Sequence, residues 1–164
     1  MKPRTILATP IAILAVALLA GAAGIAMAAP LAIKNSGSFE PNLTIDAPDG
    51  ATFEEKFTNT VVTKGKNFQI MISAGKEDLA AAKKAYNSPD GLMKDVKKYD
   101  VDDKDTLLFE GTMFGVRGYH FVHNVKVGKS MFKCTDWRKP DGVYTKADAE
   151  TMLTACKTLK KGKK

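Results

Sequence analysis

The sequence contains few of the residues that supply most nucleophiles and metal ligands. Its 164 residues include two cysteines and two histidines. It has no Gly-x-Ser-x-Gly, His-Glu-x-x-His or Cys-x-x-Cys motif, and no glycine fingerprint of a dinucleotide-binding loop. His120 and His123 are three residues apart in a predicted strand, so they point to opposite faces and cannot chelate one metal ion as a pair. We therefore expect no metal site and no cofactor, although carboxylate catalysis, which has no short signature, stays open.

The central part of the chain lacks net charge, although the whole chain has a formal charge of +7. Residues 1–28 contribute two basic residues and no acids, and Lys157 to Lys164 contribute five lysines and no acids. The remaining basic and acidic residues are equal in number, so the pI near 9.3 comes from the two ends. This distribution argues against a nucleic-acid partner. The lysine tail either complements a helix C-terminus and frays, or contacts an anionic surface.

The first 28 residues have the three parts of a secretory signal peptide. Lys2 and Arg4 give a positive start, and residues 11–20 form an apolar run. Ala26-Met27-Ala28 fits the small-x-small cleavage pattern. We therefore expect cleavage after Ala28 and a secreted or periplasmic protein. The alternative is an uncleaved segment that anchors the chain, which would be its one contact with a membrane.

Hydrophobic periodicity predicts a single domain after this signal. We expect a linker or loose first strand at 29–42, the domain at 43–160 and a basic tail at 161–164. The pattern predicts the following strands and helices: strands at 43–46, 52–57, 60–63, 67–74 and 106–111, a helix at 76–86, a second helix that Ser88 caps, and a terminal helix from Thr145. The expected class is α+β, with a mostly antiparallel sheet flanked by helices as an α/β sandwich.

The stretch from Gly118 to Trp137 predicts a β-hairpin around which the domain is organised. Gly128-Lys129 fits a two-residue type II′ turn, because glycine occupies its first central position. Gly128-Lys129-Ser130 matches the last three residues of a phosphate-binding loop, which joins a strand to a helix. Here the three residues join two predicted strands, so we interpret them as this turn. The register then pairs residues across the hairpin as follows: Val125 with Phe132, His123 with Cys134, and His120 with Trp137 on the reverse face.

Two cysteines in an exported chain indicate one disulfide bond. Cys134 falls on the apolar face of the hairpin. Thr145 and Asp148 form a capping box, and the helix that follows carries an apolar stripe that includes Cys156. We therefore predict a Cys134–Cys156 disulfide between the hairpin and the terminal helix.

The order of these elements resembles the PsbP-like α/β sandwich superfamily, which includes the extrinsic P protein of photosystem II and small exported bacterial domains. The resemblance covers Leu43 to Leu159 and depends on the strand FQIMIS, a following helix, and the glycine-flanked strand pair GVRGYHFVHNVKVGKSMFKC. Members of this superfamily are mostly binding or assembly factors. The resemblance therefore implies an accessory role, although fold alone does not determine function.

Four carboxylates cluster in the predicted loop before the strand at 106–111: Asp100, Asp102, Asp103 and Asp105. Such oxygen clusters can bind calcium, but Lys104, Asp105 and Gly111 stand where a calcium loop requires a ligand, a glycine and a closing glutamate. We favour a solvated acidic loop over a calcium site.

Two groupings are candidate functional sites. The first is a surface that contains Met113, Phe114 and Arg117 in a glycine-bounded loop, with His120 and Trp137 on the reverse face of the hairpin. Unless a helix covers this surface, it suits a small apolar ligand or an unidentified protein partner. The second grouping is His123 opposite Cys134, which would form a thiolate–imidazole dyad if Cys134 were reduced.

We therefore expect an exported, non-enzymatic binding or accessory domain. The alternative is an exported, hydrolase-like enzyme that uses the Cys134/His123 dyad or another site without a short motif.

Overall fold

The computed structural model describes residues 27–34, 42–137 and 144–162. The helices of these residues are α1 (Leu79–Ala85) and α2 (Lys146–Lys157). The strands are β1 (Met27–Ile33), β2 (Leu43–Pro48), β3 (Thr52–Lys56), β4 (Asn59–Lys64), β5 (Phe68–Ala74), β6 (Met93–Lys94), β7 (Tyr99–Asp102), β8 (Thr106–Met113), β9 (Val116–Val127), β10 (Ser130–Asp136) and β11 (Lys160–Lys161).

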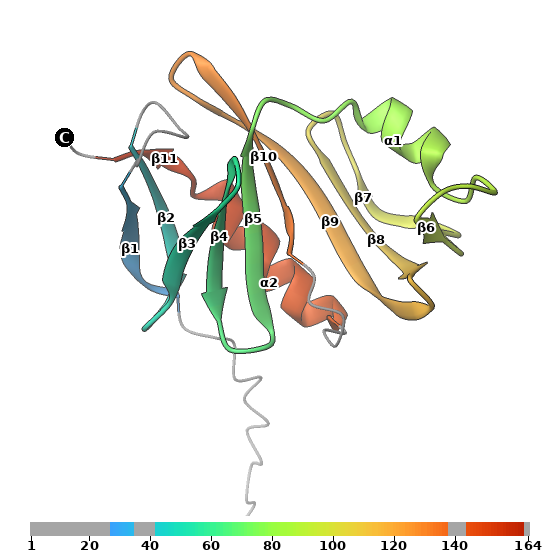
Figure 1. The fold of residues 1–164 in the computed structure, drawn as a ribbon, viewed down its shortest axis with the longest axis horizontal. Coiled ribbons are helices and arrows are strands. Elements are labelled where there is room, and N and C mark those ends of the chain that lie inside the picture. Colours follow the sequence, from blue (N-terminus) through green and yellow to red (C-terminus); the bar gives the residue numbers. More distant parts are fainter. Residues whose placement is uncertain (1–26, 35–41, 138–143, 163–164) are drawn as a thin grey trace, which may run out of the picture.

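The strands form two antiparallel sheets (Figure 1). The smaller sheet has the order β1-β2-β11, and the larger has the order β3-β4-β5-β10-β9-β8-β6, with β7 also paired to β8. Helix α2 packs against one face of the larger sheet, where it contacts β5, β9 and β10. Helix α1 lies near β7 and β8, at the edge of the larger sheet that carries β6 (Figure 1). We call the face that α2 covers the α2 face and the opposite face the reverse face.

Each face of the larger sheet carries its own hydrophobic core, formed by side chains that alternate between the two faces along each strand. The core on the α2 face joins both sheets to α2 and includes the buried side chains of Ile45, Ile70, Phe121, Phe132 and Met152. The core on the reverse face is smaller and joins α1 and the β6 segment to the sheet through these buried residues: Leu79, Met93, Val96, Leu107, Phe109 and Val122.

The predicted α+β class is wrong, because the described chain is mostly β, with two antiparallel sheets and two helices, and is closest to a β-sandwich. One cause is the helix predicted after Ser88, which is absent from the described residues. Asn87 has a left-handed backbone (φ 64°), and its side chain bonds both the N–H (2.9 Å) and the C=O (2.7 Å) of Val96. These local side-chain bonds compete with helical ones, so the segment forms a turn and the short strand β6.

The ends of the described chain add further strands. Strand β1 pairs with β2 from Met27 to Ile33. Its first two residues belong to the predicted signal peptide, and residues 29–33 lie in the segment expected to be a linker or loose first strand. Lys160 and Lys161 form β11 on the other edge of β2, and the N–H of Gly162 donates to the C=O of Asn42 (2.7 Å). The rest of the predicted signal peptide, residues 1–26, and the last two lysines lie outside the described residues.

The predicted hairpin register is confirmed for two of its three pairs. Val125 is the Cα partner of Phe132, and His123 is the Cα partner of Cys134. Gly128 has φ 62°, as the first central position of the turn requires. The third expected pair is not formed, because the ladder between β9 and β10 ends at the Thr135–Val122 pair. On its other edge β10 stays bonded to β5, where the N–H of Trp137 donates to the C=O of Gln69 (2.8 Å).

The predicted start of α2 is confirmed. The hydroxyl of Thr145 accepts from the N–H of Asp148 (3.2 Å), and the Asp148 carboxylate accepts from the N–H of Thr145 (2.9 Å), which completes the capping box. Cys156 on this helix forms a disulfide with Cys134 on β10, as predicted, with the Cα atoms 6.1 Å apart.

Candidate ligand-binding groove

A groove of about 300 Å³ lies on the reverse face of the larger sheet, beside α1. We call it the His120 groove. It is lined by residues from five strands and by the residues that directly follow α1 and β10: Met71, Tyr86, Met93, Phe109, Met113, His120, Phe121, Val122, Thr135, Asp136 and Trp137. The lining is therefore mostly thioether, aromatic and aliphatic, with a few polar groups, which is the usual composition of a small-molecule site.

Sheet register brings the floor of the groove together. Val122 on β9 is the Cα partner of Thr135 on β10, and Thr135 is the partner of Met71 on β5. His120 lies two residues from Val122, so it shares the reverse face and is a diagonal neighbour of Thr135. Three adjacent strands thus place one imidazole and one hydroxyl on the same surface.

Two side chains of the groove, the imidazole of His120 and the carboxylate of Asp136, form a buried pair. Nδ1 of His120 lies 3.1 Å from Oδ2 of Asp136, and the two side chains are 7% and 5% exposed. Oδ1 of Asp136 accepts from the N–H of Phe121 (3.1 Å), which fixes the carboxylate in place. The other nitrogen of the ring, Nε2, is buried and has no hydrogen-bond partner in the described part of the chain. The hydroxyl of Thr135 is in the same state.

Aromatic rings form one wall of the groove. The ring of Phe109 lies edge-on to the His120 ring, with centroids 5.9 Å apart, and also contacts the rings of Tyr86 (4.9 Å) and Tyr99 (5.5 Å). Such contacts stabilise ring orientation beyond the burial of apolar area. On the other side, Trp137 is half-buried, with Nζ of Lys56 5.7 Å from its ring centroid.

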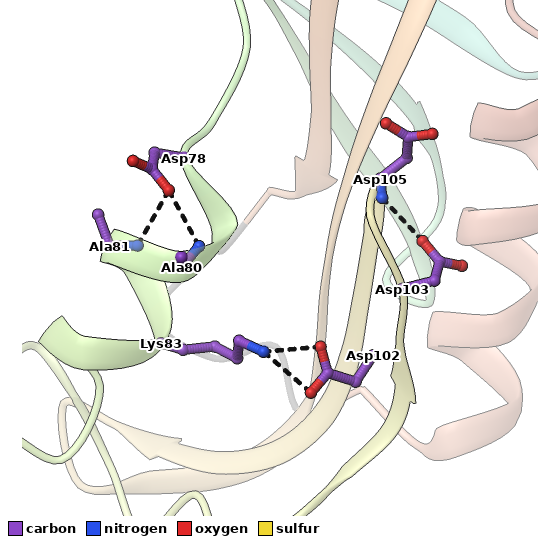
Figure 2. Close-up of polar contacts among 7 residues, drawn as sticks. All are labelled: Asp78, Ala80, Ala81, Lys83, Asp102, Asp103 and Asp105. Carbon is purple, nitrogen blue, oxygen red and sulfur yellow. Dashed lines mark hydrogen bonds and ion pairs between the residues drawn. The ribbon is translucent and has the colours of Figure 1, made fainter.

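A buried asparagine attaches the α1 side of the groove to the sheet. The amide of Asn124 on β9 accepts from the N–H of Glu77 (2.8 Å) and donates to its C=O (2.9 Å). Glu77 also pairs with Lys133 (2.7 Å), and Asp78 then caps α1 through the N–H groups of Ala80 and Ala81 (Figure 2). These contacts position the helix, and with it Tyr86, above the reverse face.

The structure brings three of the five predicted binding residues together. Met113, His120 and Trp137 line the groove, whereas Phe114 and Arg117 do not. Phe114 is 76% exposed at the turn between β8 and β9. Arg117 makes a two-pronged contact with Glu110 (2.9 and 2.6 Å), which lowers the pKa of the Glu110 carboxyl.

Sequence reasoning missed several lining residues, above all Asp136 and the methionines Met71 and Met93. Alternation from Cys134 assigns Asp136 to the α2 face, but it is the last residue of β10 and its carboxylate reaches His120. Met93 lies in the segment predicted to form the helix that Ser88 caps, which does not form. For Met71 the sequence does contain a signal, because alternation in the predicted strand at 67–74 points its side chain away from the main core.

The predicted Cys134/His123 dyad has no free thiol. His123 is opposite Cys134, as expected, but Cys134 is oxidised to Cys156. Nδ1 of His123 lies 3.1 Å from the hydroxyl of Thr106, and burial lowers the pKa of His123, with Lys157 adding to the effect. The arrangement therefore offers no thiolate nucleophile.

The carboxylates of the predicted acidic loop have separate partners (Figure 2). Asp100 and Asp102 lie on β7 and not in a loop. Asp102 accepts two bonds from Nζ of Lys83 (2.8 and 3.0 Å), and Asp103 accepts from the N–H of Asp105 (2.8 Å). Asp100 pairs with Lys146 (2.8 Å). Within residues 27–34, 42–137 and 144–162, no group of three or more His, Cys, Asp or Glu side chains could hold a metal ion.

Comparisons of the chain with protein-family models, with curated proteins and with solved structures find no match. A search of the described helices finds none with the length and apolar character needed to cross a membrane. The disulfide is compatible with an oxidising compartment.

Proposed function

We propose that this chain is an exported, non-enzymatic binding domain that holds a small apolar ligand in the His120 groove. The observation that carries the proposal is a fixed, buried imidazole in a mostly apolar groove, whose Nε2 has no hydrogen-bond partner among the described residues. A buried polar atom without a partner costs stability, and a bound ligand that supplies the missing hydrogen bond would remove that cost.

The geometry favours binding over hydrolysis. A nucleophile needs a base within hydrogen-bond reach, and Nε2 of His120 contacts no hydroxyl or thiol of the described residues. The hydroxyl of Thr135 lines the same groove but does not bond the imidazole. The accessory role implied by the PsbP-like resemblance agrees with this proposal.

Export is the second part of the proposal. Cleavage after Ala28 would leave β1 its pairs with β2 from Ala29 to Ile33, so the small sheet would survive processing. The mature protein should begin at Ala29 in N-terminal sequencing of the exported fraction. Retention of Met1 together with membrane association would contradict cleavage and favour an anchor.

Trp137 allows a direct test of ligand binding, because it is the chain's only tryptophan and it lines the groove. We expect the uncharged dye N-phenyl-1-naphthylamine to bind and to quench the emission of Trp137 by energy transfer. Met113→Lys places a charge at the groove and should weaken dye binding by about tenfold or more.

The matched control is Met131→Lys. Met131 is also half-buried on the larger sheet but does not line the groove, so this variant should keep wild-type dye affinity. Melting temperatures of both variants report whether they fold. Equal binding by the two variants, or no binding by folded wild type, would contradict the groove as the ligand site.

A further inference from the structure

The protonation pattern of His120 follows from its partner. An ionised carboxylate can only accept hydrogen bonds, and both oxygens of Asp136 accept one: Oδ1 from the N–H of Phe121 and Oδ2 from Nδ1 of His120. In this geometry Nδ1 carries a proton, and in the neutral form of the ring Nε2 presents a lone pair. A residue that lines the groove thus holds a buried hydrogen-bond acceptor without a partner among the described residues.

We infer that the ligand of the His120 groove is a one- or two-ring apolar molecule that carries a hydroxyl group, whose proton is donated to Nε2 of His120. This inference rests on the proposed function and specifies its ligand class. An apolar molecule without a donor would leave Nε2 buried and unpartnered after binding, at the same cost as before.

Thr135 completes the recognition of a hydroxyl. Its Oγ1 is buried, unpartnered in the described part of the chain, and diagonal to His120 across β9 and β10. A hydroxyl oxygen can donate its proton to Nε2 and accept the proton of Thr135 at the same time. An ether oxygen could only accept, so it would satisfy Thr135 and leave Nε2 unpartnered.

The size of the groove favours a ring-sized molecule over an ion. About 300 Å³ equals the volume of about ten water molecules in the liquid. The space lies at the small end of the range for organic ligands. The thioethers of Met71, Met93 and Met113 and the rings of Tyr86 and Phe109 then provide flat and adaptable contacts for its apolar body.

A matched pair of probes tests the inference, since 1-naphthol and 1-methoxynaphthalene share the same rings and differ in the hydroxyl proton. Calorimetric titration of the full mature chain should show that 1-naphthol binds about tenfold more tightly, the effect of one net hydrogen bond. Equal affinity for the two probes would overturn the inference.

Two variants connect this preference to the floor of the groove. Thr135→Val removes a hydroxyl that has no hydrogen-bond partner in the described part of the chain, so it should fold as the wild type does and should bind 1-naphthol less tightly. His120→Phe keeps an aromatic ring and removes the lone pair, so it should lose the preference while it still binds 1-methoxynaphthalene. If the Asp136 carboxylate, left without His120, prevents His120→Phe from folding, the double variant His120→Phe/Asp136→Asn replaces it in this test. A preference that survives in the folded variants would overturn the inference.

Other outcomes separate this inference from the proposed function. If the apolar dye binds but 1-naphthol does not, the ligand class is wrong and the groove remains a binding site. If neither binds folded wild type, the proposed function fails as well. Tighter binding of 1-naphthoate than of 1-naphthol would indicate a cationic His120 that recognises an anion. Tight binding of Cu(I), lost in both His120→Gln and Met93→Leu, would assign the imidazole and thioethers to a soft metal ion instead.

Discussion

Cys134 on β10 and Cys156 on α2 are joined by a disulfide that ties the terminal helix to the middle of the larger sheet. Both cysteines are fully buried in the core that the sheet shares with α2. The bridge closes a loop of 22 residues that contains the 138–143 segment and most of α2.

We predict that reduction of this disulfide destabilises the domain. Chain-entropy reasoning for a loop of this length gives about 3 kcal/mol in the free energy of unfolding, by a mechanism that is model-dependent. The melting temperature should fall on reduction, and hydrogen exchange should accelerate first in α2. The Cys134→Ala/Cys156→Ala variant should show no response to reductant. Two free thiols in denatured exported protein would contradict the bridge.

The basic tail should not be uniformly dispensable. The lysine-rich composition predicts a tail that frays or contacts an anionic surface, but Lys160 and Lys161 pair with Thr44 and Leu43, and the N–H of Gly162 donates to the C=O of Asn42. A chain that ends at Leu159 should lose about 1–3 kcal/mol of stability, since each lost backbone hydrogen bond contributes about 0.5–1.5 kcal/mol. A chain that ends at Gly162 should melt as the full chain does. Identical melting of both truncations would mean that β11 contributes nothing.

Phe114 should be replaceable by asparagine with a gain in stability. Phe114 and Gly115 form the two-residue turn between β8 and β9, with φ of 51° and 79°. Left-handed backbone is unfavourable for a bulky residue and well tolerated by asparagine, and Asn-Gly is a preferred pair for this turn. Phe114→Asn should raise the free energy of unfolding by up to about 1 kcal/mol. Phe114→Val, which is β-branched, should lower it in the same urea titration, and the reverse order would show that the exposed ring contributes stability.

The depressed pKa of His123 should make the protein less stable in mild acid. Burial lowers the pKa of His123, so the unfolded chain binds this proton more readily than the folded chain does. The contribution is present above the unfolded pKa of about 6.5 and is lost as pH falls toward the lower folded value. His123→Gln should lose less stability than the wild type between about pH 7.5 and about pH 5.5, where histidine titrates. Urea midpoints at the two values give the comparison, and equal losses would exclude His123 as the source.

Local signals were sufficient for the elements whose partners lie nearby in the chain. The Val125–Phe132 register follows from alternation and a two-residue turn, both of which act within the hairpin. The capping box at Thr145 depends on residues three apart. The helix after Ser88 failed because the amide of Asn87 binds Val96, nine residues away, and no periodicity reports such a bond.

The sequence by itself determined the hairpin, the start of α2 and the pairing of Cys134 with Cys156, because each depends on short-range periodicity and on the faces it defines. The tertiary structure alone decided the mostly β class, since β1 and β11 are strands only because each pairs with one edge of β2. It also decided the site. His120 and Asp136 are sixteen residues apart, and strand alternation would put them on opposite faces. Only at the end of β10 does the carboxylate reach the imidazole. The groove itself requires α1 and β6 to stand beside the reverse face, an arrangement that depends on long-range packing and on the Asn124 bonds to Glu77.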